Sequence, residues 1–188
     1  METMLQTKVN EHAQQDWLAK VYPRSTKSKE QLIQLDKYNV SSYVFVDCCG
    51  WHYQSLWPNL NIFGIETLQT AKDYKLERSK FQGLVNDQDY NNIKWPNINA
   101  TVGAVIFDYS PILKYKTVED IVAIIASAAK KYQPQIVVFN SFTILIDDSR
   151  FVDRFINLSQ LLIPGFVVIS FLYNETAIEI SYKKISNI

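Results

Sequence analysis

The chain has 188 residues, of which 47% are hydrophobic and 13% aromatic, a composition typical of one compact domain and not of a disordered chain. Lysine plus arginine equals aspartate plus glutamate at 19 each, so no bulk positive field attracts nucleic acid, although a local basic patch is compatible with this balance. No apolar run reaches the roughly 18 residues that a membrane helix needs.

The beginning of the chain, Met1 to Lys8, lacks the basic and then apolar pattern of a signal peptide. Cys48 and Cys49 are neighbours, and neighbouring cysteines rarely form a disulfide of good geometry. Their side chains point in opposite directions from a strand, so we expect no metal site there. We therefore expect reduced thiols and a cytoplasmic protein. Frequent Asn, Lys, Ile and Tyr are typical of an AT-rich genome, such as that of a bacterium or a phage.

The first 40 residues predict a helical segment, followed by a single domain over residues 41–188. A polar helix is expected over residues 8–21, ending before Pro23, and a second helix over about residues 27–38. Neither carries a recognisable chemical motif. We expect both to pack over the sheet or to cover a ligand cleft.

From residue 43 onward, short apolar runs alternate with amphipathic stretches. The runs predict strands at 43–48, 61–66, 83–86, 103–108, 135–140, 166–172 and 177–183. The amphipathic stretches predict helices at 70–80, 118–132 and 149–162, with one or two helical turns between residues 51 and 58. This alternation implies right-handed crossovers and a parallel sheet, and the turn at 173–176 makes the last two strands a hairpin. We therefore predict an α/β fold, a three-layer Rossmann-like sandwich with about seven mostly parallel strands and a C-terminal antiparallel β-hairpin.

Acidic residues stand where three of these strands end, at Asp47, Glu66 and Asp108. The first strand continues as Asp-Cys-Cys-Gly, so its carboxyl end carries an acid, two thiols and a glycine. Ligands of open α/β sheets bind at this edge, beyond the strand ends. The lead strand ending in Asp-X-Cys-Gly, the acids at successive strand ends and the closing hairpin together resemble a class I S-adenosylmethionine-dependent methyltransferase, over about residues 43–184.

The resemblance implies S-adenosylmethionine as the cofactor. In the family, the first strand ends in an acid and a glycine-rich turn that wraps the methionine part of the cofactor. Asp47 matches the acid and Gly50 matches a glycine, whereas Cys49 stands where the first glycine belongs. Trp51 and Tyr53 occupy positions that usually hold small residues, and backbone approaches a ligand closely only where side chains are absent.

Two further acidic or polar positions match cofactor contacts of the family. Glu66 matches the acid that hydrogen-bonds both ribose hydroxyls, at the usual spacing of about 20 residues after the first acid. Asn86 and Asp87 match the polar pair that contacts the adenine. Turn chemistry is the alternative interpretation of that pair.

Strand four ends at Asp108-Tyr-Ser-Pro111, where amino-methylating members of the family carry an Asp/Asn-Pro-Pro-aromatic motif. The residue types are partly present but their order differs, so the motif does not predict a nucleic-acid amino-methyltransferase. The resemblance implies that Asp108, with Tyr109 or His52, orients or deprotonates the methyl acceptor. The structural alternatives are a loop cap for Asp108 and a core position for the lone histidine.

Aromatic residues are expected to gather in the strand-end loops: Trp51, Trp57, Trp95, Tyr109 and Tyr115. Such a cluster either stacks on a planar substrate or forms a protein–protein surface, through which a partner or a second copy binds.

Two functional hypotheses remain open. The first is a small S-adenosylmethionine-dependent methyltransferase of unknown acceptor. The second is a catalytically inactive protein of the same fold that acts as a binding or assembly module, which the missing glycines favour. A flavodoxin-like nucleotide-binding protein is a distant third, since it does not predict the terminal hairpin.

Overall fold

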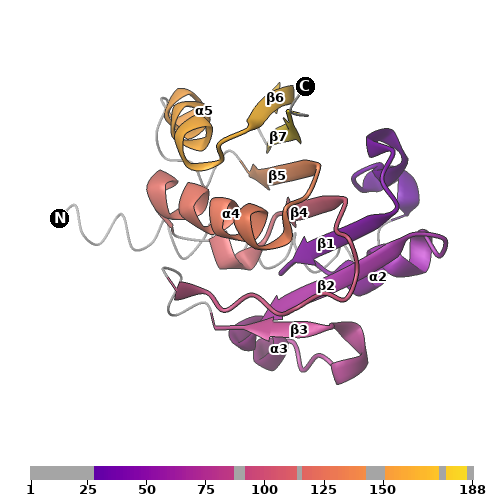
Figure 1. Ribbon diagram of the computed structural model, residues 1–188. Helices are drawn as coiled ribbons and strands as arrows, with labels where there is room; N and C mark the ends of the chain where they lie inside the picture. The colour runs from indigo at the N-terminus through magenta and orange to yellow at the C-terminus, as the bar shows by residue number, and fades with distance from the viewer. Residues whose placement is uncertain (1–27, 87–91, 114–115, 143–150, 174–176, 186–188) are drawn as a thin grey trace.

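The computed structural model describes residues 28–86, 92–113, 116–142, 151–173 and 177–185 (Figure 1). Its strands are β1 (Ser42–Val46), β2 (Asn61–Thr67), β3 (Gly83–Val85), β4 (Ala104–Asp108), β5 (Ile136–Phe142), β6 (Phe166–Tyr173) and β7 (Ala177–Lys184). Its α-helices are α2 (Gly50–Leu56), α3 (Leu68–Asp73), α4 (Val118–Tyr132) and α5 (Phe151–Leu162). Short 3-10 turns are η2 (Lys29–Gln31), η3 (Leu35–Tyr38), η4 (Arg78–Lys80) and η6 (Pro111–Leu113).

Within these residues the strands form one seven-stranded sheet in the order β3-β2-β1-β4-β5-β7-β6. β1 pairs parallel with β2 and β4, and parallel pairing continues to β3 on one side and to β5 on the other. β7 pairs antiparallel with both β5 and β6. The predicted α/β fold, with a mostly parallel sheet and a C-terminal antiparallel pair, is confirmed.

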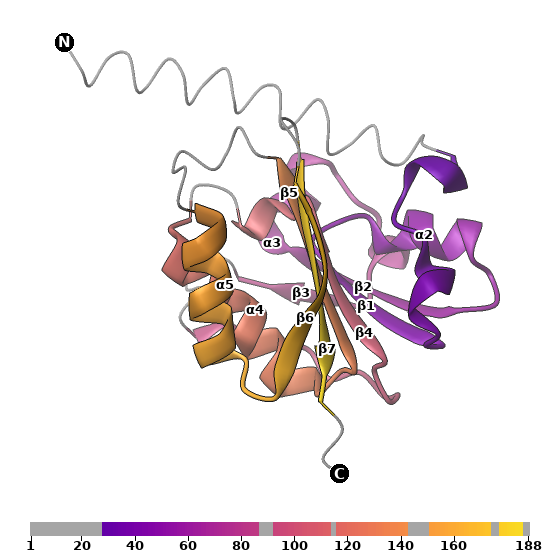
Figure 2. The same ribbon diagram turned by 90° about the horizontal axis from the view of Figure 1, so that it is seen from above.

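The core lies in two layers, one on each face of the sheet. Successive side chains of a strand point to opposite faces, so Val44 and Val46 of β1 join one layer while Tyr43 and Phe45 join the other. Figure 2 shows α4 and α5 on one face and α2 with the N-terminal 3-10 turns on the other. Every residue of β1 and β4 is buried, as expected of central strands covered on both faces.

Helix α4 has the bounds that the sequence predicts, because both of its ends carry local signals. The Thr117 hydroxyl accepts a hydrogen bond from the backbone N–H of Asp120 at 3.2 Å, which caps the first turn. Gln133 ends the helix in the left-handed conformation, and Pro134 follows it. The apolar stripe between these ends is buried against the sheet.

The predicted helix over residues 27–38 is wrong. In residues 28–38 the structure has the two turns η2 and η3, separated by extended backbone at Leu32. The backbone N–H of Ile33 donates to the Tyr53 hydroxyl at 3.4 Å, whereas an α-helix would give it an upstream carbonyl. Leu32, Ile33 and Leu35 are all buried, so packing against α2 decides the backbone here. The helix predicted over residues 8–21 lies outside the described residues.

The predicted helix over residues 70–80 is shorter and begins earlier. The Thr67 hydroxyl accepts from the backbone N–H of Thr70 at 3.0 Å, so this threonine caps α3. The helix ends at Asp73, and Lys75 adopts a positive φ of 50° that breaks the helical path.

No helix in the described part of the chain is both long and apolar enough to cross a membrane.

Gly50 provides a test of how closely α2 packs on the sheet. A Cβ atom at Gly50 would lie 2.9 Å from the Cα of Gly64 and 3.1 Å from the Cβ of Phe45. Helix propensity alone favours alanine over glycine by about 1 kcal/mol. Because the neighbouring Cα belongs to the sheet backbone and does not give way, we expect Gly50→Ala to lower the free energy of unfolding by about 1–3 kcal/mol.

Urea denaturation measures this change. Ser55→Ala, at an exposed position of the same helix, is the matched control and should change the free energy of unfolding by less than about 0.5 kcal/mol. A Gly50→Ala variant at least as stable as the wild type would contradict the close approach.

Candidate functional site

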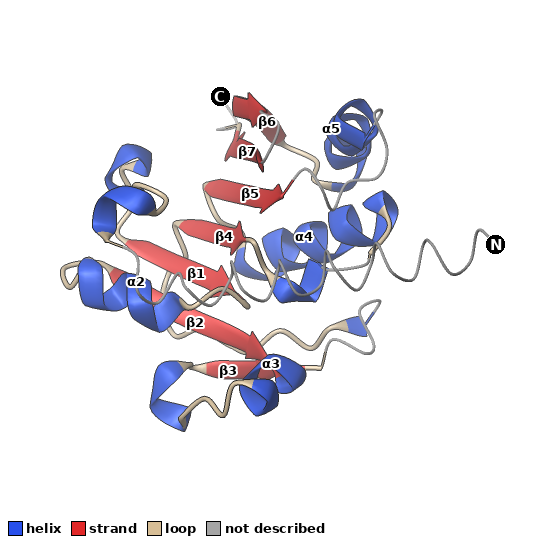
Figure 3. Cartoon of the chain, turned by 180° about the vertical axis from the view of Figure 1, so that it is seen from behind, coloured by secondary structure: helices blue, strands red, loops and turns tan. Residues whose placement is uncertain are grey.

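The candidate site lies at the carboxyl edge of the sheet, where the strand order changes direction. From β1 the chain continues to β2 and β3 on one side and returns to β4 on the other, and crevices at such switch points bind the ligands of open α/β sheets. The arrowheads of β1, β2, β4 and β5 lie along one edge in Figure 3. The sheet therefore brings Asp47, Glu66 and Asp108 to the same edge.

Asp47 follows β1 and has only 1% of its surface exposed. Its Oδ1 accepts hydrogen bonds from the backbone N–H of Thr67 at 3.3 Å and from the Thr67 hydroxyl at 3.5 Å. Among the residues that the structure describes, its Oδ2 forms no hydrogen bond of good geometry, although Thr70, Glu66 and the backbone N–H of Ile112 lie close enough to oppose the rise in its pKa. Burial raises the pKa of Asp47 to about 6, because a low-dielectric interior disfavours the charged form.

Glu66, near the end of the neighbouring strand β2, is also buried. Burial, and then the charge of Asp47, raise the pKa of Glu66 well above its ordinary value, while the backbone N–H of Cys49 acts in the opposite direction. No lysine or arginine of the described ranges forms an ion pair with either acid. We call Asp47 and Glu66 the carboxyl pair. Burial favours the protonated form of both acids, and no cation of the described residues compensates their charge.

The loop after β1, which carries Asp47, contains two residues in the left-handed conformation. Asp47 has a φ of 53° and Cys49 a φ of 60°, values that glycine adopts readily and that cost other residues about 1–2 kcal/mol. Cys49 is the residue that stands in the place of a glycine in the family pattern, and its backbone adopts a glycine-like conformation. Both cysteines are buried, and neither forms a disulfide within the described residues.

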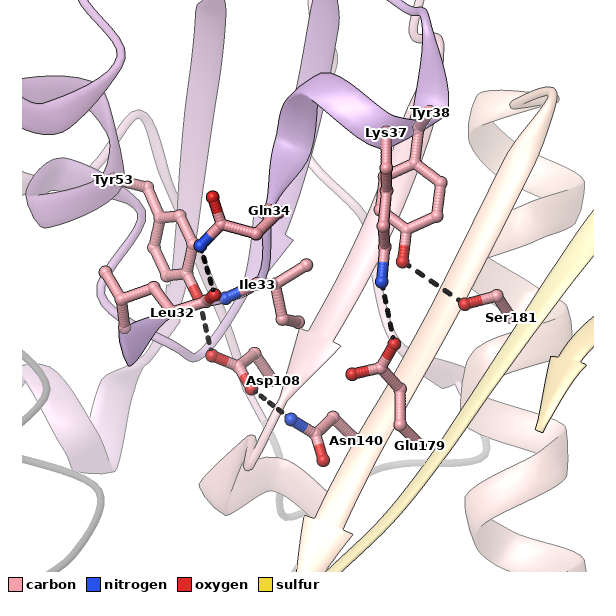
Figure 4. A network of polar contacts seen from close by, with 10 residues as sticks. All are labelled: Leu32, Ile33, Gln34, Lys37, Tyr38, Tyr53, Asp108, Asn140, Glu179 and Ser181. Carbon is pink, nitrogen blue, oxygen red and sulfur yellow. Dashed lines mark hydrogen bonds and ion pairs between the residues drawn. The ribbon is translucent and has the colours of Figure 1, made fainter. Parts of the chain in front are cut away.

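Asp108 is the centre of a buried polar network at the ends of β4 and β5 (Figure 4). Its Oδ2 accepts a hydrogen bond from the Tyr53 hydroxyl at 2.6 Å, and its Oδ1 accepts one from the Asn140 side-chain amide at 2.9 Å. The Tyr53 hydroxyl also accepts the backbone N–H of Ile33. Asp108 is fully buried, so both of its oxygens serve protein donors and its carboxylate holds neighbouring side chains in place.

The N-terminal turns lie over this network and are fastened to the C-terminal strands. The Lys37 ammonium donates to Glu179 of β7 at 2.9 Å, and the hydroxyls of Tyr38 and Ser181 lie 3.2 Å apart (Figure 4). Residues 28–38 therefore pack over one face of the sheet, which is one of the two placements that the sequence left open.

The other predicted site residues have mixed positions. Tyr109 follows β4 with a φ of 53°, and its backbone N–H donates to the Asn140 carbonyl at 2.7 Å. His52 lies in the first turn of α2, buried, with its ring 5.8 Å from the Trp51 ring. Asn86 is exposed directly after β3. Asp87 lies outside the described residues, so the adenine contact of Asn86 and Asp87 stays a prediction.

The predicted aromatic cluster in the strand-end loops is wrong for Trp57 and Trp95. Trp57 ends α2 and stacks on the Tyr53 ring at a centroid distance of 5.7 Å. Trp95 packs edge-on against Tyr132 at the end of α4. Both tryptophans are buried in core layers on opposite faces of the sheet, where their large apolar area contributes most. Tyr115 lies outside the described residues.

Sequence reasoning missed three residues of the site: Tyr53, Thr67 and Asn140. In the family pattern Tyr53 is only a bulky residue at a position that usually holds a small one, whereas in the structure its hydroxyl donates to Asp108. Thr67 follows an acid directly, and Asn140 interrupts an otherwise apolar strand. A polar residue at the end of a buried strand needs a partner, and this signal, applied to every strand, finds Thr67 and Asn140.

A cavity of about 620 Å³ lies at the opposite edge of the sheet, where the strands begin. Its lining includes Ser42, Gly103 and Gln135, and its one carboxylate, Asp36, is largely exposed. Neither residue of the carboxyl pair lines this cavity. The unpartnered buried carboxylate oxygen therefore places the candidate site at the carboxyl edge and not in this cavity.

No protein-family model and no curated protein sequence matches this chain, but solved structures match its fold. The 16S rRNA methyltransferase RmtF in complex with S-adenosyl-L-homocysteine is 10% identical, with a TM-score of 0.52 covering 95% of this chain and 72% of that one. An S-adenosylmethionine-dependent methyltransferase from Clostridium acetobutylicum ATCC 824 is 9% identical, with a TM-score of 0.54 covering 90% and 98%. The methyltransferase domain of bacterial CtHen1 is 13% identical, with a TM-score of 0.53 covering 81% and 93%.

The chain has the Rossmann-like fold of class I methyltransferases, as the order of its elements predicts. At identities of 9% to 13% the likeness concerns the fold. Function resides in the residues of the site.

The left-handed conformation of Cys49 predicts that glycine is tolerated at position 49 but not at position 48. Cys49→Gly relieves a strain of about 1–2 kcal/mol but increases the freedom of the unfolded chain by up to about 1 kcal/mol, so the free energy of unfolding should stay within about 1 kcal/mol of the wild type. Cys48→Gly removes a core side chain whose Sγ lies 3.6 Å from the Ile106 carbonyl oxygen. It should destabilise by about 2 kcal/mol. Urea denaturation compares them, and greater damage from Cys49→Gly would exclude strain at that position.

The carboxyl pair predicts a stability that falls as the pH rises. Because the pKa of Asp47 is about 6 in the folded protein against an ordinary 3.8, the folded state binds the proton more tightly than the unfolded state. This contribution is complete below the ordinary pKa and is lost as the pH rises through about 6. Between about pH 5 and pH 7.5 the wild type should lose about 1–2 kcal/mol relative to Asp47→Asn. Chemical denaturation at several pH values measures the two curves, and parallel curves would contradict the assignment.

Proposed function

We propose that the protein is an S-adenosylmethionine-dependent methyltransferase with an unknown acceptor. The observation that carries the proposal is the carboxyl pair at the ends of two neighbouring strands, in a fold of the class I methyltransferase type. Asp47 Oδ2 is buried and has no partner among the described residues, and an unpaired buried carboxylate is costly. S-adenosylmethionine carries an ammonium group, a sulfonium charge and two ribose hydroxyls, which are the kinds of group that the pair lacks.

The residues proposed to contact the cofactor are Asp47, Cys49, Gly50, Glu66, Asn86 and Asp87. In this arrangement Glu66 accepts hydrogen bonds from the ribose hydroxyls. Asp47 and the loop backbone hold the methionine part. The glycine-like backbone of Cys49 supports the assignment, because the backbone N–H of this residue already acts on the Glu66 carboxyl group.

When bound, S-adenosylmethionine supplies an activated methyl group, so the protein contributes mostly by position, holding the acceptor in line with that group. The proposed acceptor-side residues are Asp108, Tyr109 and His52. Because Asp108 accepts from Tyr53 and Asn140, its role here is to fix the site walls. His52 is the candidate that takes a proton from the acceptor.

A second function, a non-catalytic binding or assembly module of the same fold, is favoured by one observation. Trp51 stands where a small residue is usual in the family loop, and the ammonium of Lys80 lies over its ring at 5.0 Å from the centroid. Its buried Nε1 has no partner in the described ranges. A ring held in this way narrows the loop that would wrap a cofactor, and the fold is retained without cofactor binding.

Isothermal titration of the full chain with S-adenosylmethionine and S-adenosylhomocysteine tests the proposal. We expect dissociation constants in about the micromolar range, or about −8 kcal/mol. Glu66→Gln replaces one carboxyl oxygen, the proposed acceptor for the ribose hydroxyls, by an amide nitrogen that only donates, and it should weaken binding at least about tenfold. Glu77→Gln changes an exposed acid outside the site and serves as the control.

Absence of binding by either ligand at millimolar concentration, with the protein folded by circular dichroism, would overturn the cofactor assignment in favour of the module. Equal weakening by Glu66→Gln and Glu77→Gln would show that Glu66 has no specific role.

A further inference from the structure

Strand β6 forms one edge of the sheet and pairs only with β7 among the described residues. Its sequence, Phe-Val-Val-Ile-Ser-Phe-Leu-Tyr, contains no charged residue. Four of its apolar residues are exposed: Val167 by 45%, Ile169 by 48%, Phe171 by 41% and Leu172 by 58%. Such an edge is a template for pairing with another strand unless charge, proline, a β-bulge or a covering segment prevents it, and of the first three β6 has only a bulge.

The opposite edge of the sheet has the protection that β6 lacks. β3 has only three residues, and Pro96 packs so closely on Gly83 that a Cβ there would lie 2.3 Å from the proline Cγ. A short strand and a neighbouring proline both disfavour pairing with another chain. β6 is eight residues long and contains no proline.

A bulge in β6 sets its register. Val168 pairs with Tyr182 and Ser170 pairs with Ser181, so Ile169 is the extra residue of the bulge. The alternation of side chains between the two faces of the sheet therefore continues from Val168 to Ser170, as if Ile169 were absent. Ser170 is the central position of the strand once the bulged residue is left out.

The bulge places two exposed residues on the same face of the sheet. Val167 pairs with Lys183 and Leu172 pairs with Glu179. Because these two β7 residues are separated by an even number of positions, they lie on one face. Val167 and Leu172 share that face on either side of Ser170, while Phe171 lies on the other face, with Val168.

We propose that two copies of this chain pair through β6, antiparallel about a two-fold axis at Ser170. In this register Val167 lies opposite the partner's Leu172, and Val168 lies opposite the partner's Phe171. Each pair joins two apolar side chains on the same face, and Ser170 faces its own counterpart. Cross-strand apolar pairs of this kind stabilise antiparallel sheets.

A second copy fits this edge better than a charged partner does. A two-fold interface places the same strand against itself, and a strand without charges meets itself without repulsion and buries no unpaired ion. The unpaired backbone groups of both edges also become hydrogen-bonded. β7 and β5 separate β6 from β4 and β1, so pairing at this edge does not use the strand ends of the candidate site.

Sedimentation equilibrium on the full chain measures the association. We expect a dimer with a dissociation constant in about the micromolar range, and Leu172→Lys should raise it at least about tenfold by opposing a charge to Val167. Leu68→Lys is the matched control, because Leu68 is 50% exposed on α3, away from β6. A monomeric wild type, or equal dissociation by the two lysine variants, would overturn the proposal.

A disulfide test checks the register. Ser170→Cys places a thiol opposite its own counterpart, and mild oxidation should join most chains in covalent pairs. The native thiols Cys48 and Cys49 are buried, so they do not compete. Ser79→Cys, at an exposed position of η4, is the control. Cross-linking at residue 170 no greater than at residue 79 would overturn the two-fold register.

Discussion

The constraint on which the candidate site depends is the burial of two carboxyl groups side by side without a cation. Asp47 and Glu66 stand at the ends of neighbouring parallel strands, so the sheet fixes the separation of their backbones. Thr67 serves only one oxygen of Asp47. Burying two carboxyl groups without a compensating cation is costly. The pair therefore does not stabilise the fold by itself. A ligand that supplies a positive charge and hydrogen-bond donors would offset the free-energy cost of burying it.

Much of the fold follows from sequence because its signals are local. The apolar runs at β1, β4 and β5 are buried on both faces, so their hydrophobicity alone identifies them. Helix α4 carries its own caps and has the predicted bounds. The segment at residues 28–38 lacks such signals. Its backbone is decided by the hydrogen bond from Ile33 to Tyr53 and by the ion pair of Lys37 with Glu179, contacts between residues distant in the chain that no local pattern encodes.

The candidate site is predictable to the extent that strand ends are predictable. Parallel strands end at one edge, so the acids Asp47, Glu66 and Asp108 come together as soon as the strand order is known. Their partners are not predictable in the same way. The sequence predicts that Tyr53 lies in a short helical segment. Its hydroxyl reaches Asp108 because α2 packs closely on the sheet through Gly50. The packing of α2 also buries Trp57, whereas Trp95 is buried on the opposite face, against Tyr132 of α4.

Backbone strain and buried charge coincide at one edge of this molecule. Of the six non-glycine residues with positive φ in the described part, three lie directly after β1 and β4, namely Asp47, Cys49 and Tyr109, and the other three end helical turns, where this conformation is ordinary. Strained residues at strand ends persist only when the surroundings fix them, and they gather at ligand sites. The strained loop and the unpaired carboxyl group both lower the free energy of unfolding, and the folded chain keeps both at the same edge of the sheet. A module that only presents a surface would need neither. A ligand held against loop backbone by two acids makes use of both, because it takes the hydrogen bonds and the charge that the protein leaves unmatched.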